Sequence, residues 1–285
     1  MTIIDYLHFP FVRYAFIVGI LISLVSAVVG VPLVLKRYSY LGDGLSHIAF
    51  SATAIAVVAN VSNNIYIVMP ITIITAILLL VPRRNSRIAG DAKIAAISVG
   101  SLALGYFLVN TYSSSSNVSG DVCASLFGST SILTLTISDV ISCAVLAAVV
   151  LAVFVFFYNK IFAVTFDANF VIAQGVKGAA YEVILAVIIG ITVSLSMRLV
   201  GALLTSALII FPALSAMAVF KTFKSVIICS GIFSVVCTTL GLVLSILFDA
   251  PVGATIVLTD MIVFILFSLM KGRLIWRKTL GSGAR

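Results

Sequence analysis

Charged residues are scarce in this chain, and their scarcity is the first constraint on its fold. They make up 9% of the 285 residues, whereas 62% of the residues are hydrophobic. An average soluble domain carries about 25% charged residues and uses them to cover its surface. Here apolar runs of about 20 residues, the length that crosses a bilayer, recur from one end of the sequence to the other. These features exclude a soluble globular protein and predict an all-α, polytopic bundle of transmembrane helices.

Motifs for hydrolytic chemistry are missing as well. The sequence contains no G-x-x-x-x-G-K-[ST] phosphate loop, because the nearest stretch, residues 174–178, has the wrong spacing and follows no strand. The H-E-x-x-H and G-x-S-x-G motifs are also absent. We therefore predict that the chain is not an enzyme and hydrolyses no nucleotide.

Cysteines are few and isolated, with no C-x-x-C spacing. This pattern argues against a structural zinc site and against a disulfide framework. Buried structural thiols are the default interpretation, and we expect no permanently bound cofactor. The four cysteines are Cys123, Cys143, Cys229 and Cys237.

The apolar residues that are present fall into nine segments, and the uncertainty of their ends allows eight to ten spans. The segments are residues 11–35, 44–60, 64–82, 91–110, 133–158, 180–197, 199–219, 225–248 and 252–270. No soluble domain separates them. Residues 1–280 are therefore predicted to form a single transmembrane domain, and residues 281–285 resemble a tail added by cloning.

The net charge of +8 comes from basic residues in short spacers between these segments. Nucleic-acid binding would need them clustered on an exposed domain, so we exclude it. The spacers alternate, so that most lysines and arginines share one side, which is cytoplasmic by the positive-inside rule. Nine spans then place the N-terminus outside and the C-terminus inside, with residues 112–131 outside and residues 159–179 inside.

Asp43 and His47 are the strongest candidates for chemistry. They stand four residues apart where the second apolar segment begins, so a helix directs both side chains the same way. A carboxylate and an imidazole one turn apart can meet a single cation, and this ligand pair suits Mn(II), Zn(II) or Fe(II) better than Cu(I). The alternative is a structural hydrogen bond in which Asp43 caps the helix and fixes the ring of His47. These residues alone leave both interpretations open.

Three further residues are candidates for lining a pathway. Asp139 and Asp260 are acids at apparent membrane depth, where ionisable groups are costly and often functional. Asp139 could instead lie near the outer interface, and Asp260 could bond to a neighbouring helix. Pro212 is expected to break its helix and expose backbone to a substrate, although prolines are also ordinary in transmembrane helices.

The internal segment 166–176 is predicted to contain a short amphipathic helix. Asp167 can cap its start, Gly175 can end it, and Phe166 and Phe170 share one face. Exposed aromatic residues on a cytoplasmic helix suit docking into a groove on another protein. The alternative is a helix that lies on the membrane surface.

Together these pieces resemble the zinc/manganese family of ABC importer permeases. The matching blocks are residues 36–50, 126–128, 166–167 with 175–176, 199–204 with 211–213, and 251–255. They follow the family order across nearly the whole chain, and the first block is the most specific. The resemblance implies a permease of the type II importer fold in the prokaryotic plasma or inner membrane.

The resemblance also implies partners and roles. The permease would pair with a second copy of itself in the lipid bilayer, with two cytoplasmic ATPase subunits that bind ATP, and with an external metal-binding protein. Asp43 and His47 would be pathway ligands for the transported metal, and the segment around Asp167, Phe170 and Gly175 would contact the ATPase. Which of manganese, zinc or iron is carried stays open. A metal-chelate or corrinoid permease and a proton-coupled secondary transporter using Asp139 or Asp260 are the alternatives.

Overall fold

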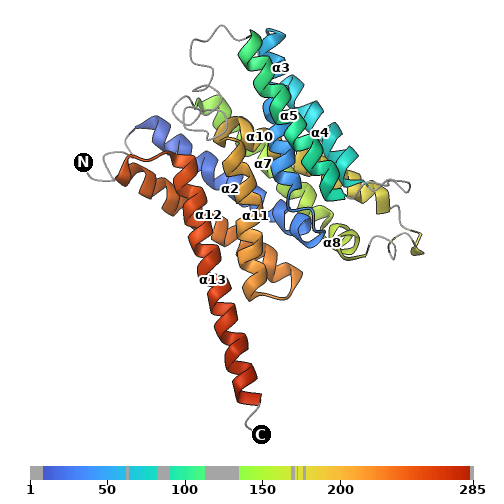
Figure 1. Cartoon of the computed structure of the whole chain (residues 1–285), viewed down its shortest axis with the longest axis vertical. Coiled ribbons are helices and arrows are strands. Elements are labelled where there is room, and N and C mark those ends of the chain that lie inside the picture. Colours follow the sequence, from blue (N-terminus) through green and yellow to red (C-terminus); the bar gives the residue numbers. More distant parts are fainter. Residues whose placement is uncertain are drawn as a thin grey trace.

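The computed structural model describes residues 9–61, 64–81, 90–112, 135–167, 171, 173–175 and 178–282. These residues form a bundle of ten helices and contain no strand (Figure 1). The helices are α2 (Pro10–Leu35), α3 (Leu41–Val58), α4 (Ile65–Leu80), α5 (Gly90–Tyr112), α7 (Ile137–Phe156), α8 (Tyr158–Phe166), α10 (Gly178–Val200), α11 (Ala202–Val219), α12 (Phe223–Phe248) and α13 (Val252–Ser282).

Each of the nine predicted apolar segments corresponds to one of these helices. Eight of the helices in the described part of the chain are long and apolar enough to cross a membrane. The ninth, α4, has 16 residues and is about 24 Å long, somewhat short of the ~30 Å hydrocarbon core. The prediction of an all-α, multi-pass membrane protein is therefore confirmed. The separate short helix α8 was not predicted, because its residues were divided between the fifth apolar segment and the internal segment.

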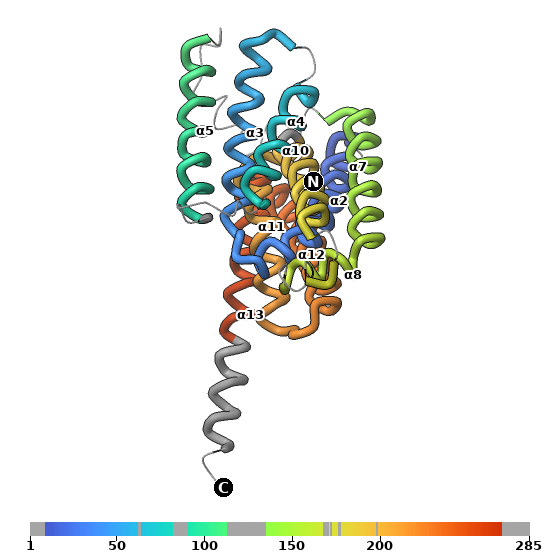
Figure 2. The backbone as a smooth tube through the Cα atoms, turned by 90° about the vertical axis from the view of Figure 1, so that its right-hand side faces the viewer, coloured from blue at the N-terminus to red at the C-terminus, as the bar shows by residue number. Residues whose placement is uncertain are grey.

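Four helices form the centre of the bundle. α2, α3, α10 and α11 are each more than 60% buried along their apolar windows, whereas α5, α7 and α13 are at most 22% buried. α3 and α5 extend beyond the other helices at one end of the molecule (Figures 1 and 2), and α13 extends at the other (Figure 1). Because of this stagger, the start of α3 lies beside the middle of the bundle.

Small residues let the central helices approach closely. A Cβ atom on Gly30 of α2 would clash with the backbone oxygen of Ile209 in α11, and one on Gly190 of α10 would lie 2.8 Å from the Cα atom of Ile73 in α4. Close contacts at glycines are a common source of helix association in lipid, where the hydrophobic effect contributes little. The contact at Gly30 therefore sets the spacing between α2 and α11.

Replacing Gly30 with alanine is expected to destabilise the protein by about 3 kcal/mol, the upper part of the usual range for overpacking. The added methyl group meets backbone, so α2 and α11 have to separate. The loss of stability is measured by thermal unfolding in detergent, with size-exclusion chromatography to follow the protein that stays folded. The matched control is Gly100→Ala on α5, where a Cβ atom meets nothing within 4 Å. This control should be neutral or slightly stabilising, and equal behaviour of the two variants would contradict the packing argument.

Candidate functional site

Asp43 and His47 share one face of the first two turns of α3. The Nε2 atom of His47 lies 3.5 Å from the Oδ2 atom of Asp43. The other carboxylate oxygen of Asp43, Oδ1, accepts a hydrogen bond of 3.2 Å from the hydroxyl of Ser206 on α11. Asp43 therefore points toward α11, and the predicted one-turn spacing of the two side chains is confirmed.

The pair is set back from the end of the bundle although it is near the start of α3. Gly42 contacts the side chain of Ile209, which in turn meets Gly30. Gly30 precedes the end of α2 at Leu35 by five residues, or about 7.5 Å of helix. The site is thus set back from the end of α2, at the level of the contact between α2 and α11.

The helix begins earlier than the sequence pattern suggested. α3 starts at Leu41, with Tyr40 as the N-cap residue, and makes no side-chain capping bond. Asp43 is the third residue of the helix, so the interpretation of Asp43 as a helix cap is wrong. Gly42 and Gly44 lie inside this first turn, where they permit close contact with Ile209 on α11 and Ile94 on α5.

The chemistry available here is that of a weak, open cation site. Asp43 supplies a carboxylate that is 39% exposed, and the side chain of His47 is 15% exposed. The Nδ1 atom of His47 is buried and has no hydrogen-bond partner among the described residues. Within those residues, no third His, Cys, Asp or Glu joins the pair in a metal-binding group. A divalent ion held here would complete its shell with water, the Ser206 hydroxyl or groups from another chain, which suits transient binding.

Asp139 has a structural role at the start of α7. Its Oδ2 atom accepts hydrogen bonds from the hydroxyl of Thr136 at 2.6 Å and from the backbone N–H of Thr136 at 3.1 Å. The Thr136 hydroxyl also accepts from the backbone N–H of Asp139, which completes a capping box. Asp139 is therefore the third residue of α7, at the end of the helix rather than deep in the span.

Asp260 is buried in α13, with 2% of the residue exposed. It lies beside Cys237 of α12, within reach of a side-chain hydrogen bond. Its Oδ2 atom has no hydrogen-bond partner among the described residues. The structure does not gather Asp260 with Asp43 and His47. The expected buried thiols are observed at Cys143 and Cys237, whereas Cys229 is partly exposed and Cys123 lies outside the described residues.

Pro212 does not break its helix, contrary to the prediction. α11 continues from Ala202 to Val219 with Pro212 in its interior, and the proline is buried. A proline removes one backbone donor and leaves the carbonyl four residues earlier without its usual partner. Packing against neighbouring helices tolerates this loss in transmembrane helices. The expected start of the last span at residues 251–253 is observed, since α13 begins at Val252.

The predicted cytoplasmic segment follows α8. Asp167 is the residue after the last turn of α8, and its carbonyl oxygen accepts the N–H of Val171 at 3.3 Å, the spacing of a helical turn. Gly175 has a φ of +76°, a left-handed conformation suited to ending a helix. Phe170 lies outside the described residues.

Aromatic contacts hold α8 against the start of α12. The rings of Phe162 and Phe166 lie 5.1 and 6.0 Å from the ring of Phe223, and Tyr158 lies 5.5 Å from it. Phe166 nevertheless stays 59% exposed, which fits both docking on another protein and a helix on the membrane surface. The four-residue spacing of Tyr158, Phe162 and Phe166 is the sequence signal that could have identified α8.

A buried ion pair lies at the same side of the bundle, and the sequence interpretation missed it. The Nζ atom of Lys36, at the end of α2, lies 2.8 Å from Oε1 of Glu182 in α10, and their side chains are 9% and 7% exposed. Burial, together with the nearby carboxylates of Glu182 and Asp91, raises the pKa of Tyr38 above its ordinary value. Glu182 is the only glutamate in the sequence, and its place at the start of an apolar segment was a usable signal.

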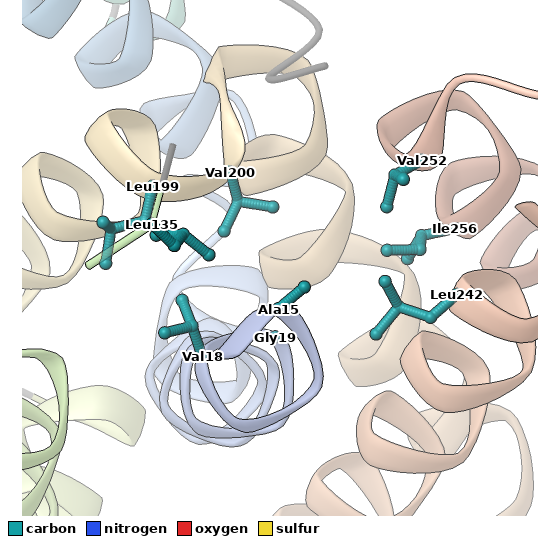
Figure 3. A pocket seen from close by; sticks show the side chains of 9 residues that line it. All are labelled: Ala15, Val18, Gly19, Leu135, Leu199, Val200, Leu242, Val252 and Ile256. Carbon is teal, nitrogen blue, oxygen red and sulfur yellow. The ribbon is translucent and has the colours of Figure 1, made fainter. Parts of the chain in front are cut away.

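A small cavity at the other end of the bundle is unsuited to a cation. It has a volume of about 10 Å³, room for about one water. Its lining is entirely apolar (Figure 3) and includes Leu199, Val200 and Val252, which belong to the sequence blocks identified above. These blocks therefore meet in space as a packing junction of α2, α10, α12 and α13.

Comparison with known proteins assigns the chain to a family. Residues 8–271 match the ABC 3 transport family. The chain is 30% identical over 260 residues to the high-affinity zinc uptake system membrane protein ZnuB of Haemophilus influenzae, covering 91% of this chain and 97% of that protein. It is 29% identical over 273 residues to the manganese import system permease protein ScaB of Streptococcus gordonii, covering 95% of each. Among solved structures, PsaBC from Streptococcus pneumoniae in complex with Fab matches with a TM-score of 0.81 at 28% identity, over 93% of each chain. The resemblance drawn from the sequence blocks is thereby confirmed, and the chain belongs to the ABC 3 transport family as a multi-pass permease of the prokaryotic plasma membrane.

Proposed function

We propose that this chain is the membrane-spanning permease subunit of an ABC importer for divalent metal ions. The observation that carries the proposal is the pair of Asp43 and His47, which faces Ser206 inside a bundle that contains few other ionisable groups. Relatives named for zinc uptake and manganese import, ZnuB and ScaB, support the same class of cargo. Asp and His ligands tolerate manganese, zinc and iron, so the proposal covers these three ions.

Energy comes from partner subunits. Because the chain has no phosphate loop, ATP is bound and hydrolysed by separate ATPase subunits on the cytoplasmic side. The segment that follows α8, with Asp167, Phe170 and Gly175, is their docking contact, and the exposed ring of Phe166 favours such a role. An external metal-binding protein delivers the ion, and a second copy of the chain completes the passage.

The transport cycle follows from these parts. Closure of the ATPase subunits on ATP moves the docking segments, and the two permease copies change their opening from one side of the membrane to the other. A metal ion that enters between the copies meets the carboxylate of Asp43 and the imidazole of His47. Because the residues that the structure describes bring together only these two strong ligands, the ion is held weakly enough to leave toward the cytoplasm.

The test is purification of the tagged chain from its native membranes, followed by reconstitution into vesicles. We expect an ATPase subunit to copurify, and uptake of radioactive Mn(II), Zn(II) or Fe(II) to require ATP and the external binding protein. Uptake that needs no ATPase and follows an imposed pH gradient would contradict the proposal and favour a proton-coupled transporter. Uptake of chelated metal alone would contradict the proposed cargo.

A further inference from the structure

An apolar groove of about 460 Å³ runs along the outside of the bundle between α2 and α12. Leu24 and Val28 form its α2 wall, and a stripe of α12 from Ile227 to Val236 forms the other. Every residue that lines the groove is aliphatic or glycine. Nothing in the proposed transport cycle uses this surface.

The walls of the groove are fixed by hydrogen bonds beside it. The hydroxyls of Ser230 and Ser234 on α12 donate to the carbonyl oxygens of Ala27 and Ser23 on α2, at 3.2 and 2.9 Å. The groove has open space at Gly231, because a Cβ atom at this position would meet only the Cδ1 atom of Leu24, at 3.8 Å. The groove is therefore a preformed feature of the α2–α12 pair.

The dimensions and position of the groove match one leaflet of a membrane. From Ile227 to Val236 the helix rises by about 14 Å, and half of a bilayer's hydrocarbon core is about 15 Å thick. α12 begins at Phe223, on the side where the basic spacers lie, so the groove opens into the cytoplasmic leaflet. Its apolar lining suits hydrocarbon along this whole length.

Positive charge lies at the cytoplasmic mouth of the groove. Lys224 precedes Ile228 by four residues and so continues the same face of α12, and Lys221 lies just before the helix; both are exposed. Thr222, the N-cap residue, makes no side-chain bond to the backbone of the first turn. The lysines and the positive end of the helix dipole together favour a phosphate at headgroup depth.

We propose that this groove binds an anionic phospholipid of the cytoplasmic leaflet, with an acyl chain along Gly231 and the headgroup phosphate at Lys221 and Lys224. A second copy of the chain fits less well. Two copies with the same membrane orientation, related by a twofold axis along the membrane normal, would bring these lysines together at one depth. The like charges would repel each other, whereas a lipid phosphate neutralises them.

The headgroup contact is tested by native mass spectrometry of the purified transporter complex, titrated with phosphatidylglycerol or phosphatidylcholine. The wild-type protein should bind phosphatidylglycerol roughly 10- to 30-fold more tightly than phosphatidylcholine, because two lysines attract an anionic headgroup by about this factor. The double variant Lys221→Gln/Lys224→Gln should lose this preference. Lys160→Gln, which removes another exposed lysine from α8, should keep it. A preference that survives in the double variant would overturn the proposal.

The acyl-chain contact is tested by filling the groove. Gly231→Phe should reduce retention of both lipids, whereas Val145→Phe, which enlarges an exposed residue on α7 away from the groove, should not. Equal retention by the two variants would overturn the proposal. Disulfide cross-linking of Ile232→Cys between two copies in membranes would overturn it as well, because a second copy would then occupy the groove. The proposal is supported if no such cross-link forms and if Gly231→Phe loses bound lipid while Val145→Phe keeps it.

Discussion

Replacing Asp43 or His47 with alanine is expected to reduce metal uptake to background while leaving the transporter assembled. Each change removes one of the only two strong ligands that the described residues bring together, so the ion loses its position in the passage. Asp43→Asn should fail as well, since its amide oxygen can still accept from Ser206 but lacks the charge that attracts a cation. ATP-dependent uptake of Mn(II) and Zn(II) by vesicles containing the complete transporter measures the effect.

The controls separate loss of the site from loss of the fold. Asp139→Asn makes the same chemical change at a helix cap on α7 and should keep most of the uptake. Ser206→Ala removes the hydroxyl that orients Asp43 and should weaken metal binding by about tenfold, the lower end of the effect of such supporting residues. Size exclusion and basal ATP hydrolysis should be unchanged in all variants. Normal uptake by both alanine variants would refute the assignment of Asp43 and His47 as pathway ligands.

Most of the fold was predictable from the sequence because the bilayer imposes strong constraints on it. A span needs a long apolar run with its backbone bonded internally, so hydrophobicity alone locates helices. The segment predicted at residues 225–248, for example, is observed as Phe223–Phe248. The start of α3 was misjudged because Gly42 and Gly44 weaken local helix propensity. Their value is in close packing against α11 and α5, which is a tertiary effect that the local sequence does not reveal.

The sequence identified only part of the candidate site. The spacing of Asp43 and His47 identified the pair, because four residues place two side chains on one helical face. Ser206 gave no signal, since a serine in an apolar span is ordinary and its partner is 163 positions away. Asp139 was singled out by its apparent depth in an apolar segment, and Pro212 by its residue type. In the structure the first caps α7, and the second is accommodated within α11.

Breaking the buried ion pair between Lys36 and Glu182 is expected to destabilise the protein strongly. Glu182→Gln or Lys36→Met should each lower the free energy of unfolding by about 3 to 5 kcal/mol, because each leaves one buried charge without its partner. The side chains are 9% and 7% exposed, so water cannot replace the lost partner. Thermal unfolding of the detergent-solubilised protein measures the loss. Variants as stable as wild type would mean that the remaining charge reaches solvent.

The double variant Lys36→Met/Glu182→Leu distinguishes a need for charge from a need for packing. Replacing both charges with apolar groups of similar size removes the cost of burying them, so most of the stability should return. The double variant can also test a role in transport, because the ion pair lies between the proposed metal site and the proposed docking segment. Lys36 lies five residues before α3, which carries Asp43 and His47, and Glu182 lies in the first turns of α10, just after the proposed docking segment. If the double variant regains stability but its ATP-dependent uptake stays low, the charged pair itself is needed during transport. If both return, the pair serves the fold alone.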